Sequence, residues 1–131
     1  MRICLDTSAY SHFKRGTRSA IEEISSASWV GVPAIVLGEL RSGLLGGRRA
    51  ATNERELRAF LAHPMVVTLD VDDEAATIYA EMVVQLRRAA SPVPTNDIWI
   101  AATAAREGAA VVTFDAHFAR IAAVRSRVLS N

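Results

Sequence analysis

Two aspartates stand directly behind short apolar segments, where each could mark the end of a strand. Asp6 follows Ile3-Cys4-Leu5, and Asp115 follows the apolar segment 111–114. In open parallel α/β sheets, ligands bind beyond the carboxyl ends of the strands. If both segments are strands of one such sheet, the two carboxylates lie at the same edge of it. The pattern therefore predicts where the chemistry of this chain takes place.

Two other acids could join this edge. Glu39 has apolar or small neighbours in a segment with helical spacing, and Asp97 opens an alanine-rich segment after a proline-containing loop. Because the four acids are far apart in the sequence, only the fold could bring them together. Two carboxylates about 4 Å apart repel by roughly 4 kcal/mol at an effective dielectric near 20. A converged group therefore needs raised pKa values or a bound cation.

The kind of cation follows from the ligand atoms. A site made of oxygen ligands, with no nearby cysteine, favours a hard divalent ion such as Mg²⁺ or Mn²⁺. Such ions, held by carboxylates, recur in phosphoryl chemistry, where they activate water and orient the phosphate. The four acids thus indicate a divalent-metal site of the kind used in phosphoryl chemistry.

Each acid also has a purely structural interpretation. Asp6 and Asp97 could each cap a helix, Asp115 could lie in a turn, and Glu39 could be a solvated helix residue. Only their joint placement favours a metal site. The acidic run 72–74 is a contrast, because it complements the N-terminus of a helix and needs no further role.

Strands and helices are expected to alternate along the chain. Strands are predicted at residues 2–5, 29–32, 65–69 and 110–114, with a short fifth strand near 127–129. Helices are predicted at residues 17–26, 34–45, 53–62, 72–90 and 96–107. Asn53 is the expected N-cap of the third helix, and Gly108 is expected to end the last. This alternation predicts an α/β fold with a mostly parallel sheet covered on both faces.

Length and composition fit one compact domain over residues 1–131. Half of the residues are hydrophobic, 22% are charged, and the net charge is +1. No apolar run reaches the roughly 20 residues that a membrane span requires. The single cysteine, Cys4, is expected to lie buried in a strand. These features predict a cytoplasmic protein without disulfides and without a membrane partner.

Five segments follow a known pattern: Leu5-Asp6-Thr7-Ser8, residues 11–16, residues 38–43, residues 96–104 and residues 112–118. Together these segments resemble the PIN-domain ribonucleases, and specifically the toxins of VapBC-type toxin–antitoxin pairs. They occur in the order typical of the family and span almost the whole chain. One departure is Ala90-Ser91, where family members often have glycine at the end of the long helix.

The resemblance implies a three-layer α/β/α sandwich with a small, mostly parallel sheet. It also implies an endoribonuclease that uses Mg²⁺ or Mn²⁺ and metal-activated water, leaving 5′-phosphate and 3′-hydroxyl ends. Asp6, Asp97 and Asp115 would be the metal ligands, and Glu39 would complete the catalytic pocket by acting through a metal-bound water. The supporting polar residues that it implies are Thr7, Asn96 and Thr113.

The resemblance also implies partners. A cognate VapB-like antitoxin would hold the toxin silent by laying a helix and an extended segment across the acidic groove. The substrate would be a transfer, ribosomal or messenger RNA. Family members form homodimers and toxin–antitoxin hetero-oligomers, so both assemblies are expected.

Other residues with chemical potential are expected to have structural roles. The three histidines lack zinc-ligand spacing, and surface or packing roles are predicted for His12, His63 and His117. Trp29 and Trp99 could stack on RNA bases, but packing is the preferred interpretation. Five arginines could hold RNA phosphates or face the antitoxin, although solvated faces are the preferred interpretation: Arg41, Arg48, Arg49, Arg87 and Arg88.

Two other classes of function compete with a nuclease. A non-catalytic PIN-like module that only binds partners is the first, and the presence of all four acids argues against it. A receiver domain is the second, but Asp6 is followed by Thr7 and Ser8 instead of a second acid, and Lys14 is the only lysine. Neither a Gly-x-x-x-x-Gly-Lys phosphate loop nor a Gly-x-Gly-x-x-Gly turn is present.

Overall fold

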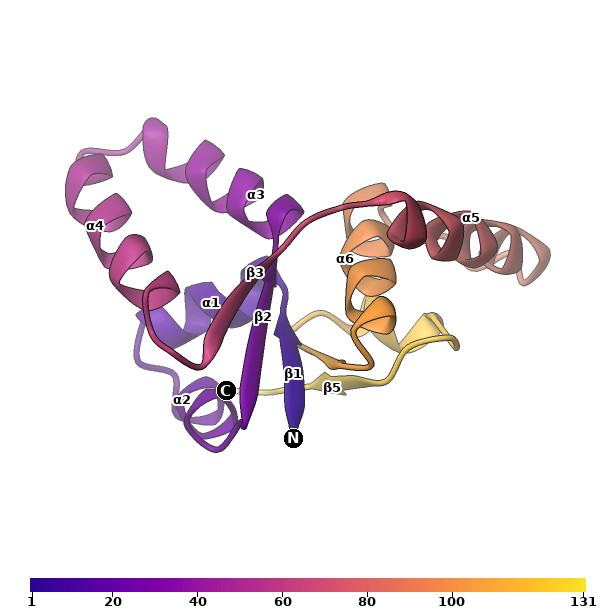
Figure 1. Cartoon of the computed structure of the whole chain (residues 1–131), viewed down its shortest axis with the longest axis horizontal. Helices are drawn as coiled ribbons and strands as arrows, with labels where there is room; N and C mark the ends of the chain where they lie inside the picture. Colours follow the sequence, from indigo (N-terminus) through magenta and orange to yellow (C-terminus); the bar gives the residue numbers. More distant parts are fainter.

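Five short strands form one all-parallel sheet in the computed structural model, which describes residues 1–131 (Figure 1). The strands are β1 (Arg2–Leu5), β2 (Trp29–Pro33), β3 (Val66–Leu69), β4 (Ala110–Thr113) and β5 (Ser126–Val128). Their order across the sheet is β3-β2-β1-β4-β5. All five predicted strands are confirmed, and the sheet is entirely parallel.

Helices cover both faces of this sheet, which confirms the predicted α/β sandwich. They are α1 (Thr7–Lys14), α2 (Arg18–Ser25), α3 (Ala34–Leu45), α4 (Ala50–Leu61), α5 (Asp73–Arg88), α6 (Thr95–Arg106) and the 3₁₀ helix η1 (Ala116–Arg120). Figure 1 shows α3 and α4 as an antiparallel pair reaching past the β3 side of the sheet, and α5 reaching out on the opposite side beside α6. None of the helices is long and apolar enough to span a bilayer.

The chain reverses its direction of travel across the sheet next to β1. From β1 it moves outward to β2 and β3, and it then returns through α5 and α6 to place β4 on the other side of β1. The register pairs Leu5 with Val112, so the carboxyl ends of β1 and β4 lie level with each other. Such a reversal is the point at which α/β sheets bind ligands.

The core is built around the adjacent strands β1 and β4 and the helix α6. Cys4, Leu5, Val111 and Val112 are completely buried, as expected for strands of a parallel sheet covered on both faces. The prediction for Cys4 is confirmed. Three of the four alanines of α6 are also buried, and their small side chains let this helix lie close to the sheet. Core packing therefore fixes the position of the N-terminus of α6, which carries Asp97.

Packing roles are confirmed for both tryptophans. The ring of Trp99 stacks on Tyr79 with centroids 3.8 Å apart, which joins α6 to α5. The guanidinium carbon of Arg2 lies 3.9 Å from the centre of the Trp29 ring. Both contacts are within the protein, as expected for structural tryptophans.

Two local predictions need correction. Helix α4 begins at Ala50, and the backbone nitrogen of Asn53 donates a hydrogen bond of 2.8 Å to the carbonyl of Arg49. Asn53 is therefore inside the helix, and the prediction that it caps the N-terminus is wrong. Helix α5 ends at Arg88, two residues earlier than predicted, because Ala90 adopts a left-handed backbone conformation with φ of +50°.

Candidate metal centre

Asp6 is the N-cap of α1 and is almost completely buried, with an exposed fraction of 4%. Its Oδ1 accepts hydrogen bonds from the backbone nitrogen of Ala9 and the hydroxyl of Ser8, both at 2.8 Å. Its Oδ2 accepts a hydrogen bond of 2.5 Å from the hydroxyl of Thr113. Burial raises the pKa of Asp6, and these hydrogen bonds oppose that rise. Asp6 is thus both a structural cap and a rigidly held carboxylate.

Asp115 stands at the end of β4 and caps η1. Its Oδ1 accepts a hydrogen bond of 3.0 Å from the backbone nitrogen of His117. Its own backbone nitrogen donates a hydrogen bond of 2.8 Å to the hydroxyl of Thr113, which in turn donates to Asp6. A single threonine hydroxyl therefore ties the ends of β1 and β4 together, and the strand-end prediction for Asp6 and Asp115 places them correctly at one edge.

Asp97 enters the same region from the first turn of α6. Its Oδ2 lies 3.4 Å from Nδ1 of His117, and the same nitrogen lies 2.9 Å from Oδ1 of Asp115. Burial raises the pKa of Asp97, the hydrogen bond from His117 lowers it, and the charges of Asp115 and Asp6 raise it further. The carboxylates therefore do converge closely enough to repel one another.

Asp97, Asp115 and His117 each offer one ligand atom, and these atoms all lie within 4.8 Å of one another. This spacing is compatible with a divalent cation between them. None of the ion pairs formed by arginine or lysine includes Asp6, Asp97 or Asp115. The acidic cluster therefore has no fixed positive charge beside it, and its donor set fits a cation.

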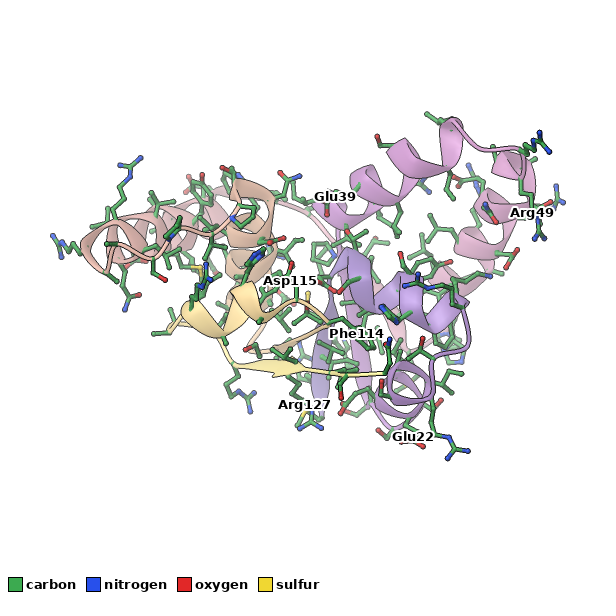
Figure 2. The ribbon with its side chains drawn as sticks, turned by 180° about the vertical axis from the view of Figure 1, so that it is seen from behind. Glu22, Glu39, Arg49, Phe114, Asp115 and Arg127 are labelled. Atoms are coloured by element: carbon green, nitrogen blue, oxygen red, sulfur yellow. The ribbon has the colours of Figure 1, made fainter.

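Glu39 lies beside this group and outside it. Its Oε1 accepts a hydrogen bond of 2.6 Å from the hydroxyl of Thr7, and its Oε2 accepts one of 3.3 Å from the amide of Asn96. Figure 2 shows Glu39 coming from α3 and Asp115 from the segment after β4. Glu39 therefore links the N-termini of α1 and α6, the helices that begin next to Asp6 and Asp97.

The other two histidines lie in structural settings, as predicted. The ring of His12 stacks on Phe114 with centroids 3.7 Å apart, and its Nδ1 lies 3.0 Å from the hydroxyl of Thr17. Nδ1 of His63 accepts a hydrogen bond of 3.1 Å from the backbone nitrogen of Met65. The predicted surface or packing roles are thus confirmed, with His12 packed on Phe114 and His63 exposed at the surface.

Five arginines were considered for phosphate binding, and none of them pairs with the cluster. Arg41 forms a bidentate ion pair with Glu54, in which both nitrogen–oxygen distances are 3.1 Å. This pair joins α3 to α4. The remaining four are exposed: Arg48, Arg49, Arg87 and Arg88. Figure 2 shows Arg49 at the outer end of the α3–α4 pair, far from Asp115.

Sequence reasoning missed two residues of the site. His117, for which a surface or packing role was expected, lies among the carboxylates because η1 turns it back toward Asp115. Ser8 was not singled out, yet it donates to Asp6 and accepts a hydrogen bond of 2.9 Å from the backbone nitrogen of Phe114. Its position two residues after an N-cap aspartate was the available signal.

Comparison with known proteins identifies the class to which this fold and site belong. The PIN-domain family model matches residues 3–124. The chain therefore belongs to the PIN-domain family.

Particular relatives are found within that class. Ribonuclease VapC4 from Mycobacterium tuberculosis is 34% identical over 118 residues, which cover 90% of this chain and 89% of the relative. VapBC-5 from Mycobacterium tuberculosis, a member of the VapBC family of toxin–antitoxin systems, is 28% identical with a TM-score of 0.72, covering 98% of this chain and 100% of that one. VapBC2 from Rickettsia felis, bound to a promoter DNA fragment, is 22% identical with a TM-score of 0.88, covering 99% of this chain and 100% of that one.

Proposed function

We propose that this chain is a metal-dependent endoribonuclease that acts as the toxin of a VapBC-type toxin–antitoxin pair. The observation that carries the proposal is the convergence of Asp6, Asp97 and Asp115 at the reversal point of the sheet, without a lysine or arginine to neutralise them. The homology to Ribonuclease VapC4 over most of both chains supports RNA as the substrate.

Mg²⁺ or Mn²⁺ is the proposed cofactor, and when bound it would supply activation of water and neutralisation of charge on the scissile phosphate. Asp97 and Asp115 would hold it directly, because their side chains are only partly buried and their oxygens face a common space. Asp6, which lies between the end of β1 and the start of α1, would add the third carboxylate. The close approach of these acids is what makes a cation favourable there.

The remaining polar residues position these acids. Thr113 fixes the carboxylate of Asp6 and the backbone of Asp115 at once. Thr7 and Asn96 hold Glu39 between the two helix N-termini. In this proposal Glu39 closes the acidic pocket and acts on the cation indirectly, since the charges of Asp6 and Asp115 raise the pKa of Asp97 and that of Glu39 does not contribute. The precise placement of ligands on rigid elements is what such a site requires.

A VapB-like antitoxin is the proposed partner. The homologous VapBC-5 belongs to a family of toxin–antitoxin systems, and the VapBC2 structure shares this fold almost along its whole length. The antitoxin would silence the nuclease by covering the acidic groove. A homodimer and a toxin–antitoxin hetero-oligomer are the proposed assemblies.

Induced expression in bacteria tests the toxin proposal. The wild-type chain is expected to arrest growth, and RNA from arrested cells should contain new 5′-phosphate and 3′-hydroxyl ends. Asp97→Asn is the matched variant, because Asp97 is free of the capping bonds that hold Asp6 and the fold should survive the change. Equal arrest by both proteins at equal abundance would refute catalytic toxicity.

A non-catalytic partner-binding module predicts a different pattern. Such a protein would still bind an antitoxin, but neither the wild-type chain nor Asp97→Asn would generate RNA ends. Finding 2′,3′-cyclic phosphate ends would instead show cleavage in which the 2′-hydroxyl is the nucleophile. The same end-mapping experiment therefore separates three outcomes.

A further inference from the structure

His117 lies where an imidazole ligand would lie in this site. Its Nδ1 is 2.9 Å from Oδ1 of Asp115 and 3.4 Å from Oδ2 of Asp97. These are contacts of one nitrogen with two different carboxylates from two different elements. This placement of the ring nitrogen between two carboxylates is not expected of a residue that only packs on the surface.

We propose that His117 binds the catalytic cation directly through Nδ1 and biases the site toward a first-row transition ion such as Mn²⁺ over Mg²⁺. This inference rests on the metal dependence proposed above. It adds a nitrogen donor to a centre whose other expected ligands are all oxygens.

The distances agree with ligand atoms that share one ion. Two ligands at right angles, each about 2.1 Å from an ion in octahedral geometry, are about 3.0 Å from each other. The Nδ1–Oδ distances of 2.9 and 3.4 Å bracket that spacing. The cluster can therefore accept an ion with little movement of the side chains, by loss of the hydrogen bond between the imidazole and Asp97 and of its close contact with Asp115.

The backbone around His117 holds the ring in place. The nitrogen of His117 donates to Asp115, which caps η1, and the next residue, Phe118, is completely buried in the core. Arg120 donates a hydrogen bond of 2.8 Å to the carbonyl of Pro92 and fastens the end of η1 to the loop before α6. The imidazole is thus presented by an anchored turn, as a ligand should be.

The nitrogen donor gives the site a chemical preference. Mg²⁺ favours oxygen ligands and retains its waters, whereas imidazole suits transition ions better. Removing the imidazole is therefore expected to weaken binding of Mn²⁺ more than binding of Mg²⁺. An alternative role predicts the opposite sign: if His117 only donates hydrogen bonds to Asp97 and Asp115, it competes with the ion and its removal strengthens binding.

Metal binding by the purified chain tests the proposal without RNA. Mn²⁺ and Mg²⁺ are titrated calorimetrically into the wild type, His117→Ala, His117→Gln and the control His63→Ala, each checked for folding by circular dichroism. We expect both changes at position 117 to weaken Mn²⁺ binding by about tenfold or more and to lower the ratio of Mn²⁺ to Mg²⁺ affinity. His63→Ala should bind like the wild type, because His63 is a loop residue bonded to Met65.

Pulsed electron paramagnetic resonance of the Mn²⁺-loaded proteins gives a second measurement. A ¹⁴N coupling from a directly bound imidazole is expected in the wild type and in His63→Ala, and it should be absent from both His117 variants. Mn²⁺ bound without ¹⁴N coupling, or bound more tightly by His117→Ala, would overturn the role of His117 and leave the nuclease proposal intact. No metal binding by the wild type would contradict the proposed function itself.

Discussion

The hydroxyl of Thr113 donates a hydrogen bond of 2.5 Å to the buried carboxylate of Asp6 and so joins the ends of β4 and β1. The same hydroxyl accepts a hydrogen bond from the backbone nitrogen of Asp115. Thr113 is completely buried, so water cannot replace either bond. The position of two expected metal ligands therefore depends on one side chain.

Replacing Thr113 with valine should destabilise the protein. The variant keeps the shape of the side chain but removes one of the hydrogen bonds to Asp6 and leaves the backbone nitrogen of Asp115 without its partner. This change costs about 1–3 kcal/mol of unfolding free energy. Urea unfolding at neutral pH measures this loss. Thr113→Ser keeps the hydroxyl and should lose much less; equal losses for both variants would show that the methyl group, and not the hydroxyl, matters.

Asp97→Asn should stabilise the metal-free protein. It should also abolish the increase in stability that a bound metal ion gives the wild type. The change removes one of the mutually repelling charges, and an increase of about 1 kcal/mol is expected at neutral pH in the presence of a chelator. Added Mn²⁺ should raise the melting temperature of the wild type by mass action and leave that of the variant nearly unchanged. A metal-induced shift of equal size in both proteins would argue against Asp97 as a ligand.

The advantage of Asp97→Asn should depend on pH. Because burial raises the pKa of Asp97 in the folded state, the folded wild type holds this proton more tightly than the unfolded chain. That contribution is fully present below the unfolded pKa of about 3.9 and is lost as the pH rises through the folded pKa. The difference in stability between the variant and the wild type should therefore grow across this window and then level off. A difference that shrinks with rising pH would contradict the assigned direction.

Ala90→Gly should stabilise the chain by about 1 kcal/mol, since Ala90 has a φ of +50° that favours glycine. The matched control is Ala89→Gly. Ala89 is also exposed but has an ordinary right-handed φ of −82°, so glycine there should destabilise. Chemical denaturation of both variants measures the contrast. Destabilisation by Ala90→Gly would mean that the left-handed turn after α5 is not the conformation in solution.

The elements that carry the site could be predicted because their signals are local. Apolar segments before Asp6 and Asp115 mark two parallel strands, and the strand-end rule then places both acids at one edge. Helix α3 has the predicted bounds of 34–45, since Pro33 precedes it and Gly46 follows it. These features need only neighbouring residues to be recognised.

The missed features depend on tertiary contacts. Asn53 is a good N-cap type, but helix α4 starts a turn earlier, at Ala50, where no side chain caps it. The place of His117 is set by the 3₁₀ turn after Asp115 and by burial of Phe118, which the spacing of histidines and cysteines does not reveal. Similarly, only the folded chain shows that the carboxylate oxygens of Glu39 accept hydrogen bonds from Thr7 and Asn96.

Cleavage of RNA by the purified chain is the decisive measurement of the proposed metal-dependent nuclease activity. The wild type and Asp97→Asn are compared on total bacterial RNA with Mn²⁺, with Mg²⁺ and with a chelator. Cleavage by the wild type is expected only when a divalent cation is present, with products that carry 5′-phosphate ends. Asp97→Asn should lose at least about 100-fold of this activity. Cleavage that persists in the chelator, or that is equally fast in Asp97→Asn, would rule out a metal-dependent nuclease with Asp97 as a ligand.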